Sequence, residues 1–277
     1  YNKLKHLSDD RQTKPAQTMI LYFSGTGNTR YCAKALAQIL GDSVFDISPR
    51  QRDGDIPDNA STRQRIVWMF PIYSWGVPPV VVEYMRQADI SGASEVPHYM
   101  VATCGDDAGN AAKMWRRLVS VRGWTPRSAY TIQMPNTYVC LPGFDVDKDE
   151  IRRAKIDAAP ERIAAIAAAI MQDNLSAQPH DMVTRGCCAW LKTSVIYPSF
   201  KNNGVKPQRF ALTDVCIGCG ACARACPMSN ITIENGHPHW GRNCAMCLAC
   251  YPRCPTHAVM YGHATRSKGQ YRGPEAT

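Results

Sequence analysis

Short hydrophobic runs alternate with amphipathic stretches over roughly the first 170 residues of the chain. The runs predict five strands, at residues 18–23, 43–47, 65–70, 98–104 and 128–134. The stretches between them carry apolar residues at helical spacing and predict helices near residues 28–40, 78–87 and 108–121. Alternating strands and helices are typical of a parallel sheet with crossover helices, so the pattern predicts a doubly wound α/β domain.

The hydrophobic pattern and the composition divide the chain into five segments. These are a polar N-terminal segment (1–17), the α/β domain (18–172), a basic connector (173–209), a cysteine-rich domain (210–262) and a C-terminal tail (263–277). Within the α/β domain, Pro160 interrupts a helical pattern and is expected to kink the helix or to begin a second one. In the connector, Trp190 and Phe200 are the expected anchors on one of the two domains.

Eight of the thirteen cysteines lie in one 39-residue window. They form two copies of the pattern C-x2-C-x2-C-x3-C-P, which begin at Cys216 and Cys244. This run is typical of bacterial ferredoxins, in which three cysteines bind one [4Fe–4S] cubane and the fourth binds the other. The predicted ligands are Cys216, Cys219, Cys222 and Cys254 for one cluster, and Cys244, Cys247, Cys250 and Cys226 for the other.

Structural zinc is the alternative interpretation of paired CxxC motifs. Zinc explains neither eight ligands in one repeat nor the two C-x3-C-P endings, so clusters are favoured. Two adjacent clusters in turn favour electron transfer over a purely structural role. Residues 1–17 contain no apolar secretion signal, and this use of cysteine suits a reducing compartment, so we expect a cytoplasmic protein.

A glycine-rich turn follows the first predicted strand and precedes a predicted helix. It contains Ser24, Gly25, Thr26, Gly27, Asn28 and Thr29. Backbone N–H groups, three hydroxyl groups and the positive end of a helix dipole together predict a phosphate site. The turn is neither a dinucleotide fingerprint, because Arg30 occupies the third glycine position, nor a Walker loop, which needs Gly-Lys-Ser/Thr. A plain glycine-rich turn without a ligand is the less favoured alternative.

The phosphate turn resembles the FMN-phosphate loop of flavodoxins, and two further loops lie where that resemblance implies the other flavin contacts. The loop after the third strand supplies Pro71, Tyr73, Ser74, Trp75 and Gly76. The loop after the fourth strand supplies Cys104, Gly105, Asp106, Asp107 and Gly109. Tyr73 and Trp75 are able to stack on an isoalloxazine ring, and ordinary packing at the sheet edge is the alternative for either one alone.

Many flavodoxins place a second stacking Tyr in the third loop, where this sequence has Ala108 or Gly109. One flavin face is therefore expected to be open or to be covered by the other domain. The loop at residues 134–147, which contains Tyr138, is a candidate cover.

Taken together, residues 18–172 and 210–262 resemble the flavodoxin–ferredoxin fusion proteins of the EFR1-type ferredoxin family. The resemblance implies a flavodoxin-like, doubly wound, five-stranded parallel sheet followed by a small α+β two-cluster ferredoxin domain. It implies FMN and two [4Fe–4S] clusters as cofactors, and electron transfer to or from a redox protein or a small acceptor. A flavin-dependent reductase acting on a small substrate at the exposed flavin face is the alternative hypothesis.

The formal charge of the chain is +9, which raises the hypothesis of a redox-responsive protein that binds nucleic acid. Two clusters and a flavin phosphate would lower this charge to about +3. The lysines and arginines also form no run of five or six, so binding to nucleic acid is disfavoured. No stretch approaches the roughly 18 apolar residues of a membrane span.

Overall fold

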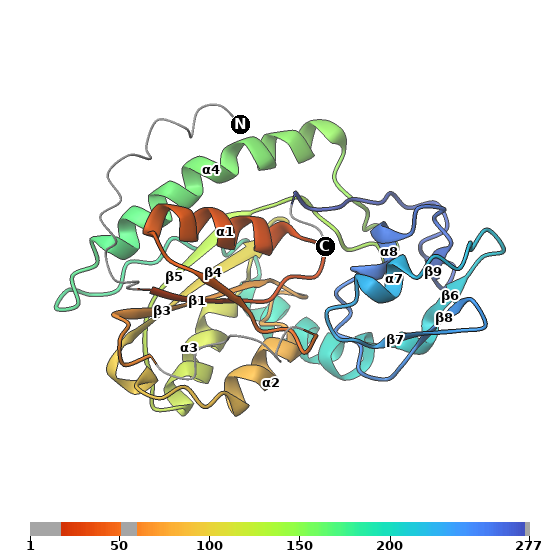
Figure 1. Cartoon of the computed structure of the whole chain (residues 1–277). Coiled ribbons are helices and arrows are strands. Elements are labelled where there is room, and N and C mark those ends of the chain that lie inside the picture. The colour runs from red at the N-terminus through yellow and green to blue at the C-terminus, as the bar shows by residue number, and fades with distance from the viewer. Residues whose placement is uncertain (1–17, 51–59, 275–277) are drawn as a thin grey trace.

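A five-stranded, all-parallel sheet forms the centre of the larger of two lobes (Figure 1). The structure is a computed structural model that describes residues 18–50 and 60–274; the polar N-terminal segment (1–17) and residues 51–59 and 275–277 lie outside this part. The strands are β1 (Thr18–Tyr22), β2 (Val44–Asp46), β3 (Arg65–Pro71), β4 (Pro97–Cys104) and β5 (Thr125–Gln133). Their order, β2-β1-β3-β4-β5, is the flavodoxin-like order and confirms the predicted α/β fold.

Helices cover both faces of this sheet, which explains why its strands are continuous hydrophobic runs. One face packs on α1 (Asn28–Leu40) and α4 (Asp149–Met171), and the other on α2 (Pro79–Gln87) and α3 (Ala111–Val121). A short 3-10 helix, η2 (Ala93–Glu95), precedes β4. The sheet therefore separates two hydrophobic cores, and its carboxyl edge faces the smaller lobe (Figure 1).

The helix α4 runs without a break through Pro160, so the expected second helix does not begin there. Pro160 is exposed, whereas Ala159 and Ile163 are buried against the core that α1 also covers. Packing of the buried side keeps α4 continuous while the proline ring lies on the solvent side. Neither α4 nor any other helix in the described part of the chain is long and apolar enough to cross a membrane.

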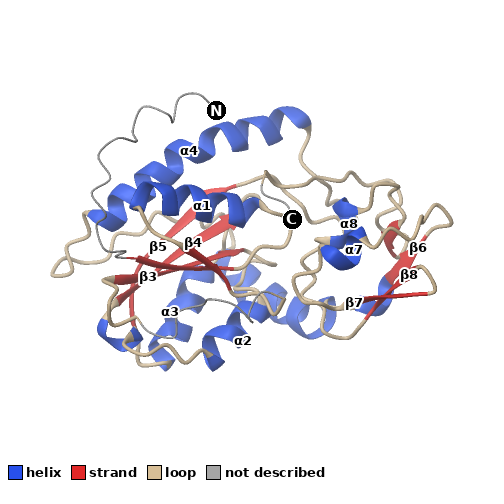
Figure 2. Ribbon diagram, viewed as in Figure 1, coloured by secondary structure: helices blue, strands red, loops and turns tan. Residues whose placement is uncertain are grey.

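The smaller lobe contains two pairs of short strands and two short helices (Figure 2). Its ribbons pair β6 (Phe210–Leu212) with β9 (Val259–Tyr261), and β7 (Ile231–Glu234) with β8 (His237–Trp240). Each cysteine motif contains one short helix, α7 (Ala221–Arg224) in the first and α8 (Cys250–Arg253) in the second, and the two helices pack together. The internal repeat of the sequence is thus also a repeat of structure.

A run of short helices connects the two lobes. It comprises α5 (Ala189–Leu191), η3 (Lys192–Ile196), α6 (Tyr197–Ser199), η4 (Phe200–Gly204) and η5 (Pro207–Arg209). Phe200 is buried as expected and meets the Tyr73 ring edge-on, with ring centroids 6.5 Å apart. Trp190 is 69% exposed, so its prediction as an anchor was wrong. Tyr197 takes that place, because it is buried and donates a hydrogen bond to the Val77 carbonyl.

Residues 265–274, here called the C-terminal strap, join the smaller lobe to the larger one. On α8, the Pro252 carbonyl accepts a hydrogen bond from Arg272 Nε (2.7 Å), and the Tyr251 carbonyl accepts one from Gln270 Nε2 (2.7 Å). Figure 1 shows this end of the chain between α8 and the beginning of α1.

The far end of the strap binds the glycine-rich turn after β1. The Gly273 N–H donates to the Thr26 carbonyl (2.8 Å), and the Tyr271 hydroxyl donates to Asn28 Oδ1 (3.0 Å). Gly273 is needed at this point, because a Cβ atom there would lie 2.5 Å from the Asn28 amide nitrogen. The strap therefore fixes the predicted phosphate turn relative to α8.

Replacing Gly273 by Ala should lower the free energy of unfolding by about 1–3 kcal/mol, because the new methyl group collides with the Asn28 amide. Tyr271→Phe should lower it by about 1–2 kcal/mol, because buried Asn28 Oδ1 loses its donor. Thermal unfolding of anaerobically purified protein measures both effects. Ser267→Ala, at an exposed strap residue, is the control; an unchanged midpoint in Gly273→Ala would show that the strap is not seated on the turn.

Candidate functional site

Three loops meet at the carboxyl edge of the sheet, because β1, β3 and β4 are adjacent and parallel. A cavity of about 370 Å³ opens between them. This volume lies within the range of roughly 300–1,000 Å³ that is usual for small-molecule and cofactor sites. The edge of the sheet thus carries a site of cofactor size where the strand order predicts one.

Most of the predicted flavin contacts line this cavity. They are Ser24, Gly25, Thr26, Asn28, Thr29, Pro71, Tyr73, Ser74, Trp75, Cys104, Gly105, Asp106 and Asp107. The other three predicted residues, Gly27, Gly76 and Gly109, do not line the cavity. Gly76 lies under the Tyr197 ring, and Gly109 lies against Trp75. A Cβ atom at Gly76 or at Gly109 would collide with the neighbouring residue.

The glycine-rich turn leads directly into α1. Gly27 adopts the left-handed conformation (φ 104°), and its N–H donates to Ser24 Oγ at 3.2 Å. Gly27 has no side chain to cap α1, and the first turn of the helix contains no acidic residue. No side-chain cap and no carboxylate of the first turn therefore competes with an anion for the positive end of the α1 dipole.

Asn28 connects this turn to two distant segments. Its Nδ2 donates to the Pro135 carbonyl (2.9 Å), and its Oδ1 accepts the hydrogen bond from Tyr271 of the strap. The Thr29 hydroxyl pairs with the Thr103 hydroxyl at the end of β4 (2.7 Å). The predicted phosphate turn is thus held by β4, by the 134–147 loop and by the strap.

The second loop presents Trp75 from a strained turn. Ser74 and Trp75 both have positive φ angles (45° and 62°), and Tyr73 and Gly76 exchange backbone hydrogen bonds across them. The connector supports the turn from outside: the Thr193 hydroxyl donates to the Trp75 carbonyl (2.8 Å). Non-glycine residues in this conformation cost energy and cluster at binding sites, where the strain fixes a side chain.

Charged side chains fix the third loop. Lys192 Nζ lies 2.6 Å from Asp107 Oδ2 and 5.1 Å from the centre of the Trp75 ring, so one cation of the connector holds the second and third loops together. Asn136 Nδ2 donates to Asp147 (3.1 Å) and, at 3.4 Å, to Asp106. This network holds the 134–147 loop beside the third loop.

The cavity also has walls that the predicted site residues do not include. The 134–147 loop contributes Met134, Pro135, Asn136, Thr137, Tyr138, Leu141 and Phe144, and the strands and connector contribute Ile72, Thr103, Ile196 and Phe200. Tyr138 therefore does lie at the cavity, and its ring packs edge-on against Phe144 with centroids 5.8 Å apart. The connector could have been suspected from the helical spacing of Thr193, Tyr197 and Phe200.

The remaining wall comes from the second cysteine motif. Met246, Cys247 and Leu248 line the cavity, so the smaller lobe covers one side of it. Gly25 makes this close approach possible: a Cβ atom there would lie 2.7 Å from the Cys247 Cβ and 2.8 Å from its carbonyl oxygen. A predicted cluster ligand is therefore in contact with the predicted phosphate turn.

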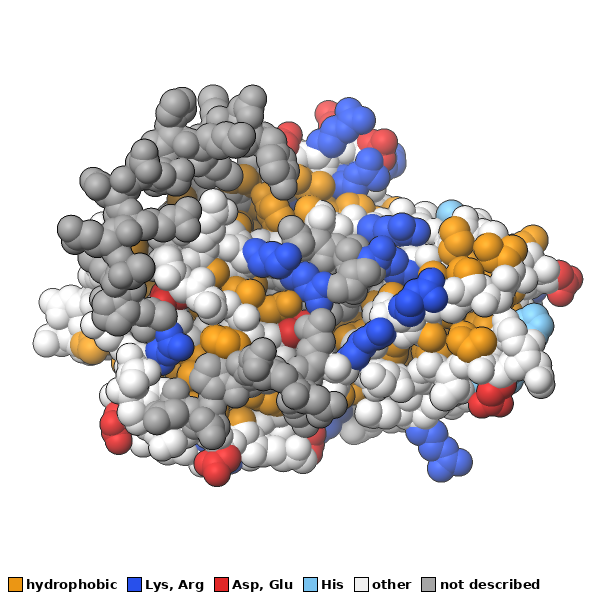
Figure 3. Space-filling model, in the orientation of Figure 1, with side chains coloured by type: hydrophobic (Ala, Val, Ile, Leu, Met, Phe, Trp, Pro, Cys, Tyr) orange, Lys and Arg blue, Asp and Glu red, His pale blue; other side chains and the backbone are white. Residues whose placement is uncertain are grey.

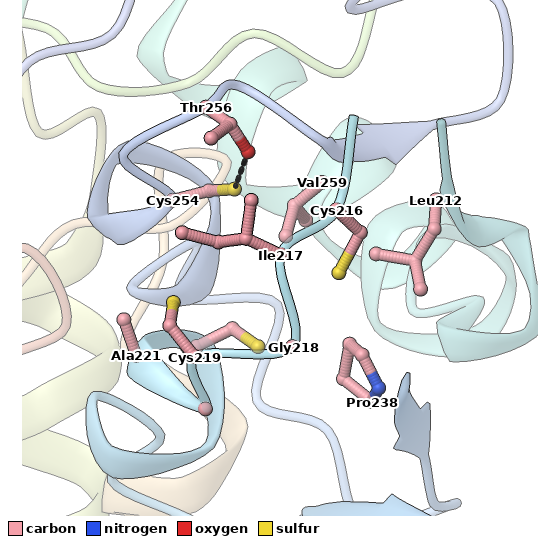
Figure 4. A pocket seen from close by; sticks show the side chains of 12 residues that line it. Leu212, Cys216, Ile217, Gly218, Cys219, Ala221, Pro238, Cys254, Thr256 and Val259 are labelled. Carbon is pink, nitrogen blue, oxygen red and sulfur yellow. Dashed lines mark hydrogen bonds between the residues drawn. The ribbon is translucent and has the colours of Figure 1, made fainter. Parts of the chain in front are cut away.

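The cysteines of the first predicted cluster line a single cavity. Cys216, Cys219 and Cys222 reach it from the first motif, and Cys254 reaches it from the second. In Figure 4 the sulfur atoms of Cys216, Cys219 and Cys254 lie around the same space. Cys254 of the second motif thus lies with three cysteines of the first motif, the grouping that the ferredoxin spacing predicts for one cluster.

The second predicted set is gathered in the same way. Burial raises the pKa of the Cys250 thiol, and the nearby Cys247, Cys244 and Cys226 raise it further. A metal bound by these thiols would have to displace their protons. Within residues 18–50 and 60–274, no three His, Cys, Asp or Glu side chains form a compact site for a single metal ion.

The last cysteine of each motif, Cys226 or Cys254, accepts a hydrogen bond from a backbone N–H group. The N–H four residues after each one donates to its sulfur: Asn230 to Cys226 (3.4 Å) and Ala258 to Cys254 (3.1 Å). Burial alone would raise the pKa of Cys254, but hydrogen bonds from Thr256 and the neighbouring backbone outweigh it and lower this pKa. Such donors stabilise thiolates and tune the potential of a bound cluster.

Both motifs use left-handed residues at the same two places. In the first motif these are Gly218 and Gly220, with φ angles of 65° and 69°; in the second they are Met246 and Leu248, with 54° and 58°. Glycine adopts this conformation freely, whereas other residues pay roughly 1–2 kcal/mol each. The loop of the second motif, which borders the cavity, is therefore more strained than the loop of the first motif.

Comparison with known proteins identifies the smaller lobe more directly than the larger one. Residues 215–259 match the 4Fe-4S dicluster domain, so this part of the chain is an iron–sulfur domain. Among curated proteins, no sequence matches this chain significantly.

Several solved structures resemble the chain weakly. A protein assigned as a flavoprotein from Bacteroides uniformis is 17% identical, with a TM-score of 0.36, over 43% of this chain and 92% of that one. A second protein assigned as a flavoprotein, from Bacteroides eggerthii, is 16% identical, with a TM-score of 0.36, over 52% of this chain and 98% of that one. A flavodoxin from the domain Archaea is 14% identical, with a TM-score of 0.35, over 55% and 99%. The fold itself rests on the strand order and register of the sheet.

Serine variants of four cysteines should reveal whether the last cysteine of each motif binds the cluster of its own motif or that of the other motif. Each variant should lose about four of about eight irons per chain. Because the fourth ligands cross, Cys226→Ser should give the same residual EPR spectrum as Cys244→Ser, and Cys254→Ser the same as Cys216→Ser. Cys187→Ser, at an exposed connector cysteine, should keep all the iron. A match between Cys226→Ser and Cys216→Ser would instead place each cluster within one motif.

Proposed function

We propose that this protein is an electron-transfer iron–sulfur flavoprotein that holds FMN in the cavity and two [4Fe–4S] clusters in the smaller lobe. The observation that carries the proposal is the wall shared by the two sites, where Cys247 contacts Gly25. A redox cofactor in the cavity and a cluster on Cys247 would be direct neighbours. The same two sites on separate surfaces would not suggest a shared electron path.

The residues that line the cavity fit FMN. The uncapped beginning of α1 and the hydroxyls of Ser24 and Thr26 would hold a terminal phosphate, which favours FMN over FAD. Trp75 and Tyr73 would flank the ring system, and the apolar lining would exclude water from it. When bound, a flavin exchanges electrons singly or in pairs, whereas each cluster exchanges them singly.

The two predicted clusters would have different neighbours. The set that contains Cys247 borders the cavity, so it is the inner cluster. In the other set, Cys219 is exposed, and Ile217, which follows Cys216, is 65% exposed. We therefore propose that electrons pass between the flavin and an outside partner through the inner cluster first and the outer cluster second.

The surface charge suggests what kind of partner docks. Figure 3 shows Lys and Arg side chains in a band over the junction of the two lobes. Arg253, next to the outer-cluster cysteine Cys254, lies close enough to Arg272 and Arg30 for their charges to lower its pKa, after burial itself. A positive surface beside a cluster favours an acidic redox protein as partner, and we propose this over a nucleic acid.

A second candidate function is reduction of a small substrate in the same cavity. Leu141 and Phe144 line the cavity and are 47% and 44% exposed, and Ile196 continues this apolar rim. Such a mouth suits a small apolar acceptor. Both functions agree with the flavodoxin–ferredoxin fusion family that the sequence resembles, and we propose membership of it.

Identification of the extracted cofactor tests the flavin proposal most directly. Anaerobically purified protein should release one FMN per chain on denaturation, together with about eight irons. Protein that holds iron but takes up no FMN when it is offered would contradict the proposal. Turnover of a small acceptor by the photoreduced protein, without a second protein, would favour the reductase.

Replacing Gly25 by Ala tests the shared wall. The new methyl group collides with backbone and Cβ atoms of Cys247, so the two lobes must separate there, at a cost of about 1–3 kcal/mol in unfolding free energy. After a light pulse that reduces the flavin, transfer to the clusters should be slower than in the wild type, while iron content is unchanged. Gly92→Ala, whose new methyl group would collide with Ser61 away from the cavity, is the matched control. Equal transfer rates in Gly25→Ala and the wild type would rule out this path.

A further inference from the structure

The two left-handed residues of the second cysteine motif carry large apolar side chains, which cluster binding does not require. Alignment of the two motifs places Met246 opposite Gly218 and Leu248 opposite Gly220. The first motif shows that glycine satisfies the backbone geometry at both places. The second motif nevertheless keeps two large apolar side chains at positions that disfavour them.

The surroundings of the two motifs differ in a way that explains this choice. A Cβ atom at residue 218 would lie 2.7 Å from the Gly236 carbonyl oxygen, so no side chain fits there. In the second motif, Met246 and Leu248 are each only 3% exposed, and both line the cavity between the lobes. Their side chains therefore fill space beside Cys247, on the side that faces the flavin site.

We propose that Met246 and Leu248 form an apolar seal that excludes water from the gap between the flavin and the inner cluster. The strained backbone is retained because these side chains are needed at the cavity, not because the cluster needs them. This inference rests on the proposed function, and it names the residues that set the environment of the flavin.

The seal has a defined effect on the redox behaviour of the flavin. Apolar walls disfavour the more negatively charged, reduced form of a buried cofactor, because they cannot replace its hydration. Met246 and Leu248 should therefore lower the flavin midpoint potential. They should also strengthen flavin binding, because their buried side chains lie against the cavity that the flavin would fill.

The test compares the holoprotein with Met246→Gly, Leu248→Gly and the double variant. We expect the double variant to keep its iron, since the first motif binds with glycine at the same positions. Its flavin dissociation constant should rise by about tenfold, the equivalent of about 1.4 kcal/mol. Its flavin midpoint potential should become more positive in a spectroelectrochemical titration.

Two further variants test whether Met246 and Leu248 act by excluding water or only by packing. Met246→Gln keeps the length of the side chain but makes it polar, so the potential should shift in the same direction with little loss of flavin affinity. Ala249→Gly is the control: Ala249 is buried in the same loop but does not line the cavity, so neither quantity should change.

Three results would overturn the inference. The first is an unchanged flavin potential in both Met246→Gln and the double glycine variant. The second is loss of iron from the glycine variants when Ala249→Gly keeps it, which would mean that the side chains build the cluster site. The third is an equal shift in Ala249→Gly. Failure of the proposed function is a different outcome, because the wild-type protein would then bind no flavin at all.

Discussion

The backbone contact between Gly25 and Cys247 is the constraint on which the arrangement of the two lobes depends. One residue belongs to the turn that begins α1, and the other to the loop that carries three predicted ligands of one cluster. The approach is too close for any side chain at residue 25. Two sites that each resemble an independent module are thereby placed side by side, as the proposed electron path requires, and the surrounding segments hold that contact in place.

Three such segments come from widely separated parts of the chain. The connector holds the second and third loops through Lys192 and Thr193, and the 134–147 loop is held through Asn136. The strap runs from α8 to Thr26 and Asn28. Each makes hydrogen bonds or ion pairs with loop residues, so the loops are positioned by polar contacts with fixed directions rather than by hydrophobic packing alone.

The parts of this structure that sequence could predict are those that depend on local patterns. The parallel strands are buried on both faces and are therefore continuous hydrophobic runs, and the cysteine spacing follows from the shape of a cubane. Both patterns can be recognised in the sequence alone. The glycine-rich turn is equally local. Its placement at the cavity with Ser24 and Thr29 follows from the strand order alone.

Contacts between distant residues could not be read in this way. Nothing near Asn28 in the sequence indicates that Tyr271 will bind it, and nothing near Gly25 indicates Cys247. Trp190 was expected to be an anchor because large aromatic residues are usually buried, yet the helical phase of the connector buries Tyr197 instead. At Pro160 the local rule was outweighed by packing of α4 on the core.

The short helix α8 gives the smaller lobe a further property. Cys250 begins this helix and Cys254 directly follows it, and the two residues belong to different predicted cluster sites. The same helix receives the strap through Tyr251 and Pro252. If these cysteines bind clusters as proposed, the ligand bonds of both sites act on the one helix that also positions the turn at Asn28 through the strap.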